Sequence, residues 1–126
     1  MRKLLIAGVS FSALILSGCL ATPNEARSKI PRFEGNSNKT AKEVAGCIYN
    51  GWTNTRFQFE RDNTTHTESF NDVITVFTIN DVMFADIKNS VNGSNVRFYN
   101  TVLFGGIPLE SNRREILEKC LVDNGK

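Results

Sequence analysis

Few side chains in this chain of 126 residues have the types and spacing that catalysis or metal binding requires. Its single histidine, His66, stands two positions before Glu68, so in a strand both side chains would share one face and could exchange a proton or bind a metal ion. A zinc site needs further ligands, and the sequence offers no second histidine. There is no Gly-x-Ser-x-Gly motif, and Gly105-Gly106 lacks the following lysine of a phosphate-binding loop. We therefore predict a solvated edge strand at His66, no enzyme, no metal site and no cofactor.

The N-terminal segment carries the strongest pattern in the chain. Met1-Arg2-Lys3 is positively charged, and the run from Leu4 to Leu16 contains no charged residue. As a helix this run would be roughly 20 Å long, which is too short for a hydrocarbon core of about 30 Å. A charged start, a short apolar run and then small residues are typical of a secretory signal. We expect residues 1–18 to be a signal peptide.

The apolar run ends in Leu16-Ser17-Gly18-Cys19, which resembles the lipobox of bacterial lipoproteins. The resemblance implies cleavage before Cys19, a lipid on its thiol and acylation of the new N-terminus. Several acyl chains would hold the protein on a membrane without spanning it. Leu20, the residue after the lipidated cysteine, implies export to the outer membrane with the domain on the periplasmic side. The alternative is an ordinary signal peptide with an incidental cysteine.

Lipidation of Cys19 leaves Cys47 and Cys120 as the remaining thiols. An exported chain meets an oxidising compartment, where two cysteines form one intramolecular pair. Closing a loop from residue 47 to residue 120 would stabilise the fold by roughly 4 kcal/mol in the chain-entropy model. A metal site or a reactive thiol is the competing interpretation, but the chain has no Cys-x-x-Cys motif. We predict a structural disulfide.

Composition argues against nucleic acid as a partner. Hydrophobic residues make up 40% and charged residues 22% of the chain, which is typical of a globular protein. The formal charge of +2 includes Arg2 and Lys3. Without the signal peptide the basic and acidic residues balance, so no basic surface of the kind that binds phosphate backbones is expected.

The sequence after Cys19 predicts a tether and one α+β domain. Residues 19–39 contain two prolines and no regular period, so we expect a flexible tether with a reach of roughly 25 Å. For residues 40–126 we expect a meander of four or five antiparallel strands, with N- and C-terminal helices packed on one face and joined by the disulfide. The first helix should start at a Thr40–Glu43 capping box and stop at Asn50-Gly51, and the last should cover 111–121. Strands are expected near 56–60, 66–70, 73–79, 82–87 and 96–104, with tight turns at Asn80-Asp81 and Asn92-Gly93.

Some aromatic and basic residues could contact a partner. Trp52, at the end of the first expected helix, either closes the core or anchors a partner, and we favour the core. Arg97 and Tyr99 fall on the strand face opposite Phe98, and Arg56 could lie near them. If both helices cover the other face, these residues form a possible partner surface. Otherwise they are ordinary solvent-facing side chains.

Cys47-Ile48 followed by Trp52, the Val96-Arg97-Phe98-Tyr99 strand and a late cysteine resemble a group of small, uncharacterised bacterial lipoproteins. The resemblance implies the same fold and the same disulfide, and it supplies no activity. The leading hypothesis is therefore a non-enzymatic binding or accessory protein, lipid-tethered in the envelope. The alternatives are an inhibitor of an envelope-attacking hydrolase such as lysozyme, whose inhibitory loop would be a turn near 62–65 or 91–95, and a phage- or plasmid-borne exclusion lipoprotein.

Overall fold

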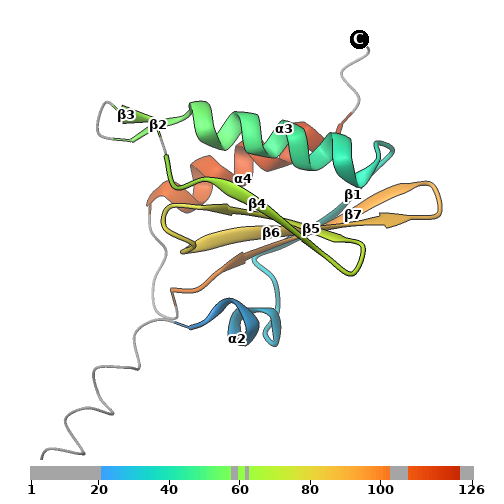
Figure 1. The fold of residues 1–126 in the computed structure, drawn as a ribbon, viewed down its shortest axis with the longest axis horizontal. Coiled ribbons are helices and arrows are strands. Elements are labelled where there is room, and N and C mark those ends of the chain that lie inside the picture. Colours follow the sequence, from blue (N-terminus) through green and yellow to red (C-terminus); the bar gives the residue numbers. More distant parts are fainter. Residues whose placement is uncertain (1–20, 58–59, 62, 103–107, 123–126) are drawn as a thin grey trace, which may run out of the picture.

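The computed structural model describes residues 21–57, 60–61, 63–102 and 108–122. The predicted signal peptide, Cys19 and the Gly105-Gly106 pair lie outside these residues. A five-stranded antiparallel sheet forms the middle layer, with α3 and α4 on one face and α2 on the other (Figure 1). The elements are α2 (Pro23–Arg27), β1 (Phe33–Ser37), α3 (Ala41–Asn54), β2 (Arg56–Phe57), β3 (Glu60–Arg61), β4 (His66–Phe70), β5 (Val73–Thr78), β6 (Met83–Ser90), β7 (Gly93–Asn100) and α4 (Pro108–Leu121).

The α+β class, the antiparallel sheet and the paired helices are confirmed. The strand order is β1-β7-β6-β5-β4, so β4 to β7 form the predicted meander and β1 adds a fifth strand beside β7. In the part of the chain that the structure describes, the short strands β2 and β3 pair with each other in a separate two-stranded sheet.

The prediction of a flexible tether is wrong for residues 21–39. This segment forms α2 and then β1, whose Phe33 pairs with Phe98 and whose Ser37 pairs with Ser94. Phe33 also packs against the helix-side core. A five-residue strand with one large apolar residue has little propensity of its own, and pairing with β7 supplies its stability. The folded domain therefore includes residues 21–39 and does not start at residue 40.

The predicted hairpins are present, but two of the turns differ from the prediction. Ser90 pairs with Gly93, so the β6–β7 loop is Val91-Asn92, one residue earlier than expected. The β5–β6 loop spans residues 79–82 in place of a two-residue turn, and Ile79, Asn80 and Asp81 all have positive φ. Such backbone is costly for a branched residue such as Ile79, so the contacts that Ile79 makes with the core must hold the loop in this form.

Helix α3 starts as predicted and ends later. The Thr40 hydroxyl accepts a hydrogen bond from the Glu43 N–H at 3.2 Å, as in a capping box. The predicted stop at Asn50-Gly51 is wrong, because the helix continues to Asn54. Gly51 instead marks the close approach of α3 and α4, where an added Cβ would collide with Ile116 Cγ2. The glycine is needed for helix packing and not for a left-handed cap.

Replacing Gly51 with alanine tests this assignment. We expect Gly51→Ala to lower the free energy of unfolding by about 1–3 kcal/mol, because the methyl group overpacks the contact between the two helices. Gly46→Ala is the matched control, since nothing lies within 4 Å of an added Cβ there. At an open helical position alanine should stabilise by about 0.5–1 kcal/mol. Urea titration of both variants gives the comparison, and equal stabilisation by both would contradict the packing role of Gly51.

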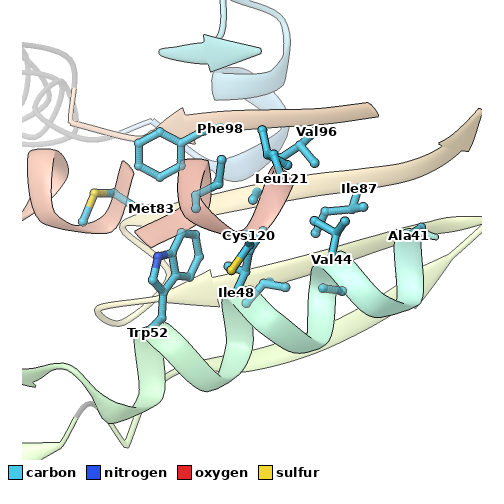
Figure 2. Close-up of a cluster of buried hydrophobic side chains, with 14 residues drawn as sticks. Ala41, Val44, Ile48, Trp52, Met83, Ile87, Val96, Phe98, Cys120 and Leu121 are labelled. Carbon is cyan, nitrogen blue, oxygen red and sulfur yellow. The ribbon is translucent and has the colours of Figure 1, made fainter. Parts of the chain in front are cut away.

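The main core lies between the sheet and the two long helices (Figure 2). The predicted disulfide is confirmed: Cys47 of α3 and Cys120 of α4 are bonded, with their Cα atoms 5.7 Å apart. Trp52 is fully buried, and its Nε1–H donates to the backbone oxygen of Arg113 at 2.9 Å, so its expected place in the core is confirmed. We call this set the helix-side core: Ala41, Val44, Ala45, Ile48, Trp52, Val76, Met83, Ala85, Ile87, Val96, Phe98, Leu117, Cys120 and Leu121.

Candidate binding cleft

Helix α2 covers part of the sheet face that was expected to be open. Thr22 caps the helix by accepting a hydrogen bond from the Glu25 N–H, and Pro23 occupies its first turn. Ala26 is buried in a second apolar cluster with Phe77, Phe84 and Tyr99, which we call the α2-side cluster. One turn of helix thus packs over β6 and β7, while residues 67–70 of β4 stay exposed.

Arg27 fastens α2 to the sheet. Its guanidinium donates to both carboxylate oxygens of Asp86, with Nε 2.7 Å from Oδ2 and Nη2 2.9 Å from Oδ1. The Thr75 hydroxyl donates to the same Oδ1 at 2.7 Å, and the Arg27 guanidinium lies 4.7 Å from the ring centroid of Phe84. The hydrogen bond to Asp86 raises the pKa of Arg27 above its ordinary value. A charged, two-pronged ion pair therefore fixes the position of α2.

An open cleft of about 550 Å³ lies between α2 and β4. Its floor is largely apolar, with the buried ring of Phe77 beside Val73 and Phe70. Phe70 is 77% exposed, which is unusual for a phenylalanine. The remaining lining residues are Thr22, Pro23, Asn24, Arg27, Glu68, Asn71, Thr75 and Asp86.

Glu68 is the exposed acidic group of this cleft. Arg27 and Asp86 neutralise each other, whereas the Glu68 side chain is 66% exposed and its Oε1 is 3.9 Å from Nε2 of His66. Glu68 therefore adds a solvated negative charge to the rim of an apolar surface. Such a combination suits a ligand that carries an apolar group next to a positive charge.

His66 is held on the same face as Glu68, as the sequence predicted. Its ring stacks on Phe77 with centroids 4.9 Å apart, its Nδ1 lies 2.9 Å from the Thr64 oxygen, and its Nε2 lies 3.6 Å from Oδ1 of Asp81. Among the described residues, no group of three or more His, Cys, Asp or Glu side chains could hold a metal ion. These contacts give His66 a structural role at the end of the cleft.

Strand β4 is the edge strand that the sequence predicted. It pairs with β5 on one side, and its other side pairs with no strand in the part of the chain that the structure describes. Its residues are exposed apart from the half-buried His66, and they include neither proline nor lysine. Proline and lysine commonly protect strand edges, so the outer edge of β4 is open to another extended segment.

The predicted partner surface of Arg56, Arg97 and Tyr99 is not assembled. Tyr99 is only 4% exposed because α2 covers it, and its ring stacks on Phe84. Arg97 is exposed, but its Nε donates to Oε2 of Glu34 at 3.1 Å. That hydrogen bond, followed by one from Asn95, lowers the pKa of Glu34. Arg56 lies in β2, outside the five-stranded sheet. The expectation failed because α2 folds over Tyr99 and because β1 brings Glu34 beside Arg97.

The sequence analysis missed Arg27 and Asp86, which together hold one wall of the cleft. A signal for α2 was present: Thr22-Pro23-Asn24-Glu25 combines a capping threonine, a proline at the first helical position and a glutamate three residues after the cap. No comparable local signal identifies Asp86 as the partner of Arg27, since 59 positions separate them.

Comparisons of the chain with protein-family models, with curated proteins and with solved structures found no match. Among the residues that the structure describes, no helix is both long and apolar enough to cross a membrane.

Proposed function

We propose that this protein is a lipid-anchored accessory protein of the bacterial envelope that binds an extended segment of another envelope component in the cleft beside β4. The signal-like N-terminus and the Leu16–Cys19 motif support the anchor, and Leu20 supports the periplasmic side of the outer membrane. The observation that carries the binding role is the open, largely apolar cleft next to an unpaired strand edge.

An extended polypeptide fits this site chemically. It would pair with the N–H and C=O groups on the outer edge of β4, as peptides do when they add a strand to a sheet. An apolar side chain of the ligand would contact Phe70, Val73 and the Phe77 ring. A lysine or arginine close to it would lie near the carboxylate of Glu68, which makes a basic and apolar segment the preferred ligand.

Site-specific photocrosslinking tests the binding role. With p-benzoylphenylalanine in place of Phe70, we expect covalent capture of one recurring partner in intact cells. The matched control is the same group in place of Tyr49, which is exposed on α3 on the opposite face of the sheet and should not capture that partner. Adding Glu68→Lys to the Phe70 probe should abolish the capture. Equal capture from both positions, or capture that Glu68→Lys leaves unchanged, would contradict the proposed cleft.

The anchor has its own test, the intact mass of protein purified from native membranes. We expect cleavage before Cys19, the added mass of acyl chains, and a gain of two hydrogen atoms when the Cys47–Cys120 bond is reduced. A cleaved chain without lipid would refute the anchor and leave a free exported protein.

A further inference from the structure

Residues two and three positions after the proposed lipid attachment site already belong to the folded domain. The Ala21 N–H donates to the Thr101 oxygen at 2.9 Å, and Thr22 already caps α2. Since consecutive Cα atoms are about 3.8 Å apart, Cys19 lies within about 8 Å of Ala21. A chain whose residues 21–39 are folded cannot lift the domain away from the anchor. An acylated Cys19 would therefore bring the surface around Ala21 and Thr101 to the bilayer.

A basic and apolar surface lies at this position. The loop between α2 and β1 carries Ile30, which is 91% exposed, with Lys29 before it and Arg32 two positions after it. Nη2 of Arg32 donates to the oxygen of Val102 at 3.2 Å, directly next to the Thr101 group that holds Ala21. The loop and the start of the described chain therefore share one region of the molecule. One open hollow of about 600 Å³ is lined by Lys29, Ile30, Arg32 and Val102, together with Ala26, Ser28, Tyr99 and Asn100.

We propose that residues 28–32, with Ile30 at their centre, form a membrane-contact surface that seats the domain on the bilayer holding its own anchor. This inference rests on the proposed lipidation of Cys19. Ile30 would enter the boundary between headgroups and acyl chains, while Lys29 would meet the phosphates of the headgroups. Arg32, whose Nε lies 3.6 Å from Oε1 of Glu110, holds the loop against the rest of the domain. The short connection from Cys19 to Ala21 selects a lipid surface as the occupant, because it leaves little room for a protein partner between this region and the bilayer.

This contact surface would fix how the domain is oriented on the bilayer. In Figure 1, α2 and the loop after it lie on one side of the sheet, and α3 and α4 lie on the other. Seating the 28–32 loop on the bilayer turns α3, α4 and their disulfide away from the membrane. An exposed apolar residue far from the anchor, such as Val91 on the β6–β7 turn, would then stay in water.

Depth-dependent fluorescence quenching tests this orientation in the mature protein extracted from membranes. Ile30→Trp and Val91→Trp place a reporter at two positions that are both more than 90% exposed, so neither change should disturb the fold. The one native tryptophan, Trp52, is buried and gives the same background in both variants. In vesicles that contain anionic phospholipid and lipids brominated on their acyl chains, we expect the Ile30→Trp emission to be quenched several-fold more strongly than that of Val91→Trp.

The outcomes separate the contact surface from the anchor. An acylated protein, verified by its mass, in which both reporters are quenched equally or not at all would overturn the contact surface and leave the anchor intact. A protein without acyl groups would overturn the anchor and, with it, this orientation. Quenching of Ile30→Trp that disappears when other envelope proteins are added to the vesicles would show that a protein occupies the hollow, which also overturns the lipid contact.

Discussion

Replacing both disulfide cysteines with alanine is expected to lower the free energy of unfolding by about 4 kcal/mol. The bond joins α3 to α4 across 73 positions of sequence, so it restricts most of the unfolded chain. Cys47 is exposed and Cys120 is buried. Truncating these two small side chains therefore adds little loss of packing to the effect of removing the covalent link. For a domain of this size, 4 kcal/mol is a large part of the total stability.

Guanidinium titration of the oxidised protein and of the Cys47→Ala/Cys120→Ala variant measures the difference. The wild-type protein in reductant is the matched control, because it loses the same covalent link without a substitution. We expect it to fall to nearly the stability of the variant, while the variant itself should not respond to reductant. A variant within 1 kcal/mol of the oxidised protein would mean that strain or residual structure in the unfolded chain offsets the entropic gain.

Trp52→Ala is expected to cost about 3–5 kcal/mol, the second large effect. Trp52 is fully buried at the far end of α3, with its ring centroid 6.0 Å from that of Phe98. The substitution leaves a cavity between the helices and the sheet, and it also removes the only hydrogen bond described for the indole, to the Arg113 oxygen. Both losses act where α3 continues past Gly51, so they report on the last turn of the helix.

Trp52 is the one tryptophan of the chain, so replacing it removes the tryptophan fluorescence signal. Unfolding in denaturant is therefore monitored by far-ultraviolet circular dichroism. Trp52→Phe keeps most of the buried area and should cost less than Trp52→Ala, since it loses mainly the hydrogen bond and part of the volume. Tyr49→Ala is the exposed control on the same helix, and we expect a change within about 1 kcal/mol. If Tyr49→Ala proved as costly as Trp52→Ala, the helix itself and not the core contact would be the source of the effect.

Local patterns predicted those parts of the fold that depend on neighbouring residues. The capping box at Thr40 and the alternation along β4 to β7 each involve contacts within a few positions or between adjacent strands. The pairing of Cys47 with Cys120 followed from the count of cysteines, once Cys19 was assigned to the lipid. Trp52 was correctly expected in the core because it continues the apolar stripe of its helix.

The candidate cleft is formed by contacts between segments that are far apart in the sequence. Nothing near Arg27 in sequence shows that it binds Asp86, and a five-residue strand such as β1 becomes recognisable only beside β7. Asn50-Gly51 is a pair that commonly ends a helix, yet here the helix continues. Because Gly51 has no side chain, Ile116 of α4 can pack directly against α3 at this position. The sequence by itself determined the α+β class, the disulfide and the expectation of a lipid anchor. Only the tertiary structure decided that α2 packs on the second sheet face and that β1 joins the sheet beside β7, since the burial of Ala26 and the packing of Phe33 depend on partners that the chain brings from far away.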